Sequence, residues 1–140
     1  MMIELSELEM RILAELEEAG EADAASMLNT IINPEGRPEE LANYQRALSK
    51  ILEKDLIEIR MDSIPTGSIP LTKRDALAEA AGLSKNYTFS KSDGHWTDIR
   101  EKGPPYFLTP QPRLFITDAG NAKSIELLEA RGYQWWRQVV

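Results

Sequence analysis

The stretch YQRALSKILEKDLIEIR, residues 44–60, passes from a helical pattern to a strand pattern within a few residues. Apolar side chains in and just before it recur at the three- and four-residue spacing of one helix face. From Asp55 onward, apolar and charged residues partly alternate, as in a half-buried strand. The stretch therefore predicts a helix over about 38–54 followed directly by a strand. The apolar stripe consists of Leu41, Tyr44, Leu48, Ile51 and Leu52.

This helix also carries basic residues on the side away from its apolar stripe. At about 100° per residue, Arg46, Lys50 and Lys54 lie within about 80° of one another. Glu39 and Glu53 share that side, so the outer face is mixed in charge with a basic bias. Two interpretations stay open: a surface that meets nucleic acid, or a solvated face whose cations pair with neighbouring acids.

Two helices are expected before this one. The motif SELE at 6–9 fits a capping box, in which each of the Ser and Glu side chains accepts a hydrogen bond from the other residue's backbone N–H. It predicts a helix over about 6–19 that ends at Gly20. A second helix is expected over about 22–32, and NPEG at 33–36 ends it.

Residues 64–112 give a less regular pattern. A loop is expected at 63–70, where Pro and Gly recur. LTKRDALAEAAGL predicts a short helix capped by Thr72. YTFSKSDGHWTDIR, residues 87–100, predicts two short strands joined by a Ser-Asp-Gly turn.

The C-terminal part predicts one more strand, over 113–117, and one more helix, over about 119–131. Helical spacing places Ala122, Ile125 and Leu128 on its inner side. The tail GYQWWRQVV is compatible with a strand or with an extension docked on the rest of the chain.

The composition is that of a soluble globular protein. The chain has 140 residues, long enough for one domain with a sizeable core. It has no cysteine, which excludes disulfides and thiolate metal sites. We find no apolar run long enough to cross a bilayer and no secretory signal, so we expect a cytoplasmic protein without a membrane partner.

The net charge of −7 is unevenly distributed. Residues 1–63 hold 6 basic and 15 acidic side chains, a net of −9, whereas residues 64–140 hold 10 and 8, a net of +2. An acidic chain repels DNA at long range, so any contact with a duplex must rely on local basic surface.

The sequence contains no motif of an enzyme. Neither a nucleophile elbow, a phosphate-binding loop nor a zinc-protease motif occurs. His95 is the only histidine, so it builds no multi-histidine metal site and leaves the Ser and Thr hydroxyls without an obvious base. We expect a protein that is not an enzyme and holds no cofactor.

Two segments carry a resemblance to a known family. RALSKILEKDLIEIR resembles the third helix and first wing strand of bacterial winged helix-turn-helix regulators of the MarR and PadR kind, although Asp55 stands where that pattern usually has glycine. LFITDAGNAKSIELLEARG resembles their return strand and following helix. The resemblance covers 6–60 and 113–131, and treats 64–112 as an unusually long insertion at the wing. It implies one α+β domain over 1–140, with a three-helix core, a β-hairpin wing and a C-terminal helix plus tail over 118–140.

The resemblance implies that the third helix enters the major groove of duplex DNA in a transcriptional regulator. On that basis, Asn43, Gln45 and Arg46 are candidates for base edges. Lys50, Lys54 and Arg37 are candidates for phosphate contacts.

In the same family the wing contacts phosphate or the minor groove. That role would fall to the hairpin near 87–100, with Lys91, His95 and Arg100 as its candidate residues. An ordinary solvated loop is the alternative for this hairpin.

Such regulators commonly form homodimers, which implies an interface on the C-terminal segment with Leu128, Trp135 and Trp136 as candidates. The alternative for both tryptophans is packing onto their own domain. For the whole protein, two other functions stay open. One is an adaptor that contacts another protein through its winged helix, and the other is an acidic mimic of nucleic acid.

Overall fold

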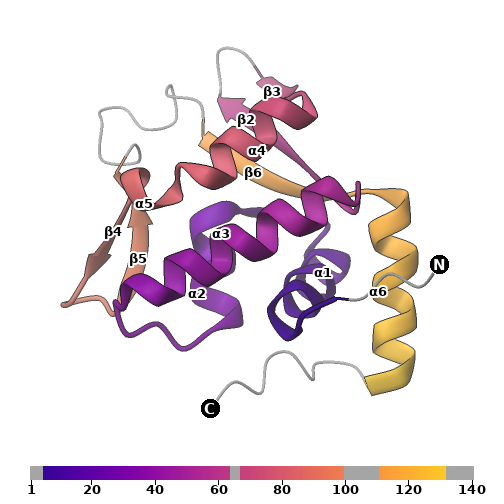
Figure 1. Cartoon of the computed structure of the whole chain (residues 1–140), viewed down its shortest axis with the longest axis horizontal. Coiled ribbons are helices and arrows are strands. Elements are labelled where there is room, and N and C mark those ends of the chain that lie inside the picture. Colours follow the sequence, from indigo (N-terminus) through magenta and orange to yellow (C-terminus); the bar gives the residue numbers. More distant parts are fainter. Residues whose placement is uncertain (1–4, 64–66, 100–110, 132–140) are drawn as a thin grey trace.

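The computed structural model describes residues 5–63, 67–99 and 111–131. These ranges form helices and antiparallel strands, so the α+β class is confirmed. Figure 1 shows the helices packed beside one sheet, with a separate hairpin at one end of the molecule. In chain order the elements are α1 (Glu7–Ala19), β1 (Glu21–Asp23), α2 (Ala24–Ile31), α3 (Pro38–Glu53), β2 (Ile57–Ser63), β3 (Gly67–Pro70), α4 (Lys73–Ala81), α5 (Leu83–Asn86), β4 (Tyr87–Ser90), β5 (His95–Asp98), β6 (Gln111–Ile116) and α6 (Asp118–Arg131).

Helix α1 begins with the predicted capping box. The Ser6 Oγ accepts a hydrogen bond from the Glu9 N–H, and the Glu9 Oε2 accepts one from the Ser6 N–H, both at 3.2 Å. The helix ends at Gly20, whose φ of 82° suits glycine and whose N–H donates to the Leu16 carbonyl at 2.7 Å.

The second predicted helix begins later than expected, because its first residues form a strand. β1 pairs antiparallel with β6, with Glu21 opposite Phe115. The Asp23 carboxylate accepts a hydrogen bond from the Ser26 N–H at 3.0 Å and caps α2. The prediction of helix over 22–32 is therefore wrong at 22 and 23, and helix begins at Ala24.

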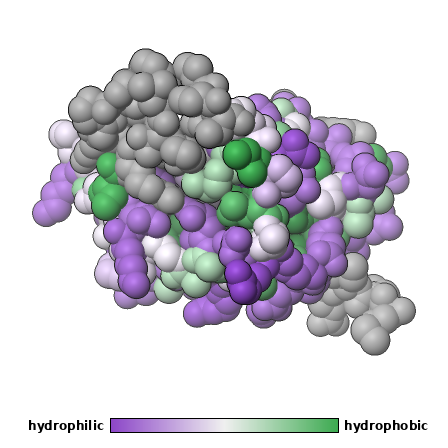
Figure 2. Space-filling view, turned by 90° about the horizontal axis from the view of Figure 1, so that it is seen from above, coloured by the Kyte–Doolittle hydropathy of each residue, from purple (hydrophilic) through white to green (hydrophobic). Residues whose placement is uncertain are grey.

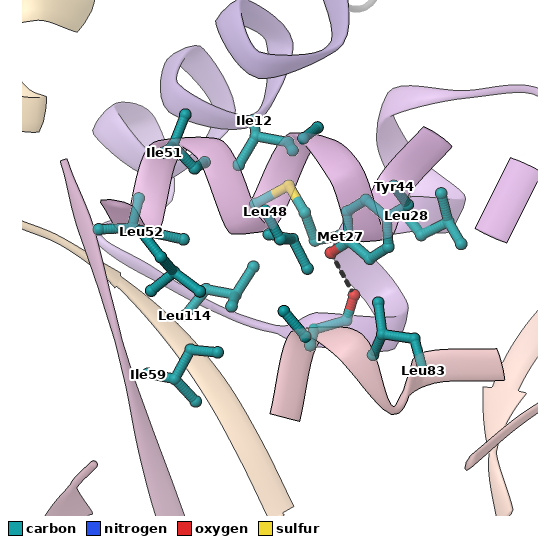
Figure 3. Close-up of a cluster of buried hydrophobic side chains, with 14 of the residues drawn as sticks. Ile12, Met27, Leu28, Tyr44, Leu48, Ile51, Leu52, Ile59, Leu83 and Leu114 are labelled. Carbon is teal, nitrogen blue, oxygen red and sulfur yellow. Dashed lines mark hydrogen bonds between the residues drawn. The ribbon is translucent and has the colours of Figure 1, made fainter. Parts of the chain in front are cut away.

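Helix α3 buries its predicted stripe, and the strand after it is confirmed. Tyr44 is fully buried, and its hydroxyl donates to the Ala24 carbonyl at 2.6 Å, the dashed line in Figure 3. Asp55 links α3 to β2 with a φ of 60°, the left-handed region that glycine adopts most easily and that Asp tolerates better than most residues.

The main sheet has the order β1-β6-β2-β3 and is antiparallel. Strand β6 lies between β1 and β2, so a strand from late in the chain joins two early ones. Strand β3 pairs with the other edge of β2, with Ile69 opposite Met61. The loop expected at 63–70 is therefore wrong at residue 63, which ends β2, and at residues 67–70, while residues 64–66 lie outside the described residues.

The segment between β3 and β6 contains both elements that its sequence predicts. The Thr72 Oγ1 accepts a hydrogen bond from the Asp75 N–H at 3.1 Å and caps α4. Strands β4 and β5 form the expected hairpin, with Phe89 opposite Trp96. This hairpin is a separate two-stranded sheet, whereas the strand that pairs with β2 on its inner side is β6.

One hydrophobic cluster joins helices α1 to α5 with the main sheet and the hairpin of the inserted segment. Figure 3 shows Leu48 of α3, Met27 of α2 and Leu83 of α5 converging on the same interior. Leu114 of β6 is also fully buried there. The inserted segment thus contributes to the core that supports α3.

Helix α6 packs on α1 through a different face from the one predicted. Ser124 is fully buried, and its hydroxyl donates to the Leu13 carbonyl at 3.1 Å. Leu128 is buried against Ala14, as expected, but Ala122 and Ile125 are exposed. The inward face of α6 is formed by Gly120, Ser124 and Leu128, because small residues allow the helix to approach its neighbours closely. Within the described ranges, no helix is both long and apolar enough to cross a bilayer.

Candidate nucleic-acid interface

The outer strip of α3 consists of Glu39, Asn43, Arg46, Lys50 and Glu53, all of which are exposed. Helix α1 flanks the strip on one side, and α4 packs against α3 on the other. The inserted segment therefore covers one flank of α3 but leaves the strip accessible.

Arg46 and Lys50 are the cations that this strip offers. The Arg46 Nη1 donates to the Asn43 Oδ1 at 3.2 Å, one turn earlier on the same helix. Within the described parts of the chain, neither cation forms an ion pair with an acid. The two positive charges are thus available to an anion, although Glu39 and Glu53 weaken the field around them.

Two other predicted contacts on α3 are engaged within the molecule. The Lys54 Nζ lies 3.5 Å from the Oε1 of Glu9, whose side chain is only 4% exposed. The Gln45 Nε2 donates to the Ala81 carbonyl in α4 at 3.3 Å. Both side chains are therefore less suited to contact DNA than their helical positions predict.

Arg37 precedes α3 and pairs with Glu35 across the turn. The hydrogen bond that Arg37 donates to the Glu35 carboxylate raises the pKa of the Arg37 guanidinium. The pair is exposed, so an incoming phosphate would have to compete with the Glu35 carboxylate for this cation.

A groove of about 280 Å³ separates the outer strip from the first turn of α1. Glu7 lies on its far wall, where a hydrogen bond from Arg131 and the charge of Arg11 lower the pKa of its carboxyl. Arg131 and Arg11 balance much of the negative charge of Glu7. Glu7 therefore does little to neutralise Arg46 and Lys50 across the groove. The groove is lined by Ser6, Glu7, Leu8, Glu9, Asn43, Arg46, Ala47 and Lys50.

The β4–β5 hairpin is held at the N-terminal end of α3 by one tryptophan and one glutamate. The Trp96 Nε1 donates to the Glu40 Oε1 at 2.9 Å. The Glu40 carboxylate also accepts hydrogen bonds from the backbone N–H groups of Glu35 and Gly36, at 2.9 and 3.1 Å. From the sequence, Glu40 is recognisable only as an acidic residue in the first turn of a helix. Its hydrogen bond to Trp96 was therefore not predicted.

The hairpin exposes two of its three candidate residues, Lys91 and His95, at its turn. Arg100 lies outside the described residues, as do Trp135 and Trp136 of the C-terminal tail. Leu128 is 2% exposed in the contact between α6 and α1. We therefore remove Leu128 from the candidate interface, because its surface is already covered by its own chain.

Arg74 is another exposed cation of the inserted segment, and the sequence did not single it out. The Arg74 side chain is 92% exposed. Among the described residues, no group of three or more His, Asp or Glu side chains is arranged to hold a metal ion.

Comparison with known proteins finds no matching family model, no matching curated protein and no matching solved structure.

Proposed function

We propose that this protein is a winged helix-turn-helix domain that binds duplex DNA through the outer strip of α3. The single observation that carries the proposal is the accessibility of Arg46 and Lys50, which face outward without an acidic partner among the described residues. Cations in this position on a helix are suited to phosphate oxygens and, for Arg46, to the O6 and N7 of guanine.

The order of the elements supports the winged-helix assignment. A short strand between α1 and α2 pairs with β6, which pairs in turn with the strand that follows α3. In this assignment, β2 and β6 are the two wing strands, and the segment between them replaces the usual short wing tip. Asp55 supports it further, since its φ of 60° supplies the backbone conformation that glycine supplies in the related pattern.

The charge of the molecule predicts weak binding with a shallow salt dependence. Each phosphate that a protein neutralises contributes roughly −0.9 to the slope of log affinity against log salt, so two contacts give a slope of about −1.8. Nonspecific affinities are typically about 10⁻⁴–10⁻⁶ M at physiological salt. We expect the weak end of that range for this acidic chain.

The family resemblance favours a cytoplasmic regulator of transcription that acts as a homodimer, and we include both features in the proposal. The exposed side of α6, where Ile125 is 41% exposed, is the dimer contact that we propose in place of Leu128. Light scattering tests it: the mass of a dimer is expected for the wild type and the mass of a monomer for Ile125→Asp.

The test of DNA binding is fluorescence anisotropy with a random duplex over a salt series. We compare the wild type with Arg46→Glu/Lys50→Glu, which changes the net charge by −4. Binding that is lost in this variant, with an unchanged circular dichroism spectrum, is the expected result.

The matched control is Arg74→Glu/Lys123→Glu, which makes the same change in net charge on the exposed Arg74 and the partly buried Lys123, both away from the strip. Equal losses in both double variants would show a general charge effect and contradict a site on α3. No binding by the wild type at about 20 mM salt, where screening is weaker than in physiological buffer, would reject DNA binding and favour the protein adaptor.

A further inference from the structure

The inner edge of the β4–β5 hairpin is closed by one side chain of α2. The Asn29 Oδ1 accepts a hydrogen bond from the Trp96 N–H, and the Asn29 Nδ2 donates to the Trp96 carbonyl, both at 2.8 Å. Both backbone groups of Trp96 therefore point toward α2 and away from β4.

The same geometry leaves the outer edge of β4 open at Phe89. In an antiparallel pair, opposite residues alternate between those that exchange backbone hydrogen bonds and those that do not. Since the backbone groups of Trp96 bond to Asn29, the Phe89–Trp96 pair is of the second kind, and the N–H and carbonyl of Phe89 point outward. Outside the β4–β5 ladder, no hydrogen bond joins either group to another described residue.

A second contact supports this register. Tyr87 lies two residues before Phe89, so its backbone groups point in the same direction. The Tyr87 N–H donates to the Leu83 carbonyl in α5, not to β5. Helix α5 thus occupies the beginning of the outer edge and leaves the part around Phe89 open, on the outer strand of the hairpin in Figure 1.

A groove of about 640 Å³ runs between this strand and the first turns of α3. Its volume is in the range of sites that bind small ligands or short peptide segments. A strand added to β4 would direct every second side chain toward the face that carries Phe89, which is the face on the groove. The groove is lined by Gly36, Pro38, Leu41, Ala42, Gln45, Ser84, Tyr87, Thr88, Phe89 and Trp96.

The charges around β4 are basic, in contrast to the molecule as a whole. Lys85 precedes the strand and Lys91 follows it, and both side chains are exposed. Neither side chain forms a hydrogen bond or an ion pair with another described residue. A ligand that lies along the strand would therefore meet a positive charge near each end.

We propose that the outer edge of β4 binds an extended peptide segment of a partner protein as an added third strand. The segment carries an apolar residue that enters the groove over Leu41 and Ala42. It carries acidic residues at both ends, opposite Lys85 and Lys91. Backbone hydrogen bonds to Phe89 supply binding, and the groove and the two lysines supply specificity. This inference is separate from DNA binding, since it uses neither Arg46 nor Lys50.

The probe is a set of fluorescent nine-residue peptides with Val, Ile or Leu at the centre, Thr at alternate positions, and Asp or Glu at both ends. We expect saturable binding to the full-length protein by anisotropy. Peptides with Lys in place of the terminal acids are expected to bind at least about tenfold more weakly, because the charge pairs become repulsive. Equal binding of both sets would contradict the proposal.

N-methylation of the peptide tests strand addition without altering the protein. Methylation of the one amide that donates to the Phe89 carbonyl is expected to abolish binding, and methylation of the adjacent amide to leave it unchanged. On the protein side, the Phe89 amide is expected to exchange rapidly with solvent when free and more slowly with peptide bound. Binding that is insensitive to every methyl group would show that no strand is added.

Two protein variants locate the site. Lys85→Glu/Lys91→Glu is expected to weaken binding of the acidic peptides at least about tenfold. The exposed cation Arg74, changed to Glu, serves as the control and is expected to leave the affinity within about twofold. Ala42→Arg fills the groove and is expected to abolish binding. If Ala42→Arg instead abolishes self-association of the protein, the occupant is a second copy of this chain and the partner peptide is rejected.

Discussion

At the scale of the single residue, Asp55 adopts a backbone angle that glycine would adopt more easily. The resemblance places glycine at this position, and the structure gives it a φ of 60°. The Asp55 carbonyl also accepts a hydrogen bond from the Thr117 hydroxyl at 2.7 Å, which holds the link between α3 and β2 against the end of β6.

Substitutions at Asp55 should therefore separate backbone effects from charge effects. The Asp55 Oδ1 lies 2.9 Å from the Lys73 Nζ. Asp55→Gly is expected to keep the free energy of unfolding within about 1 kcal/mol of wild type, because relief of the left-handed conformation offsets the loss of this ion pair and the greater freedom of the unfolded chain. Asp55→Val should lose about 2 kcal/mol, because a β-branched residue rarely adopts this φ. Urea denaturation measures both, and equal losses in the two variants would contradict this account.

Gly120 is required for a different reason, a close approach of two backbones. A Cβ at this position would lie 1.9 Å from the Leu56 carbonyl oxygen and 2.9 Å from the Ile116 Cγ1. Gly120→Ala is expected to lower the free energy of unfolding by at least about 2 kcal/mol, because α6 must move away. Gly82→Ala is the control, since its nearest neighbour would be 3.5 Å away. A neutral Gly120→Ala in the same denaturation assay would show that α6 is not fixed at this contact.

At the scale of the element, the packing of α6 on α1 includes an ion pair that predicts a dependence on pH. The Arg131 Nη1 lies 2.8 Å from the Glu7 Oε2, and hydrogen bonding by Arg131 is the main cause that lowers the pKa of Glu7 from 4.5. A carboxyl with a lowered pKa in the folded state contributes stability above its unfolded value and loses it as the pH falls through the folded value.

The variant Arg131→Met should therefore be less stable than wild type at pH 7 but equally stable at about pH 2, where Glu7 is protonated in both states. The pair is partly exposed, so we expect a difference of about 0.2–1 kcal/mol at pH 7. Lys123→Met, which removes the ion pair with Glu126 within α6, is the comparison. A difference between Arg131→Met and wild type that persists at about pH 2 would assign the effect to packing.

Two hydrogen bonds between the Asn29 side chain of α2 and the backbone of Trp96 hold the β4–β5 hairpin against the helices. Asn29→Ala removes both hydrogen bonds to the backbone of Trp96 and is expected to cost about 1–3 kcal/mol. Hydrogen exchange should increase in residues 87–98 more than in α1. Unchanged exchange in 87–98 would mean that Trp96 and Glu40 alone hold the hairpin in place.

The elements differ in how far the sequence predicted them, and the differences have physical causes. The start of α1 was predicted correctly because a capping box is a local signal that involves only residues 6–9. β1 was missed because Glu21, Ala22 and Asp23 have little intrinsic preference for a strand, and only pairing with β6 makes them one. The inward face of α6 was misplaced because Gly120 and Ser124 are buried for their small size, which a search for hydrophobic residues does not detect.

The candidate site was predicted in part. Exposure of Arg46 and Lys50 follows from helical periodicity alone. Engagement of Gln45 with α4 and of Lys54 with Glu9 depends on contacts between distant parts of the chain, which a single sequence does not reveal. The tryptophans of the tail lie outside the described residues, so their predicted role stays a prediction.

At the scale of the whole molecule, the segment inserted after β3 is part of the core and not an appendage. Leu83 is 1% exposed and packs with residues of α2 and α3. Leu83→Ala is expected to lower the free energy of unfolding by about 2–4 kcal/mol. Circular dichroism and exchange at β4–β5 should report the same denaturation midpoint in this variant, and separate midpoints would show that the segment unfolds independently.

We propose two binding surfaces on this molecule, the outer strip of α3 for DNA and the outer edge of β4 for a peptide. Figure 2, seen from above, shows hydrophobic residues near the middle of that face with hydrophilic residues around them. The outer strip of α3 and the edge of β4 are formed by different residues, and their proposed ligands differ in chemistry. Separate variants can therefore remove one without the other.

The position of β6 between β1 and β2 has a consequence for synthesis on the ribosome. The strand that completes the sheet begins at residue 111, so it is synthesised after both of its neighbours, β1 and β2. Until then, the backbone groups that will bond to β6 have no partner strand, and the nascent chain carries two open sheet edges. The sheet can therefore be completed only after β6 has been synthesised, and chains that terminate before β6 should be the ones that chaperones and proteases recognise.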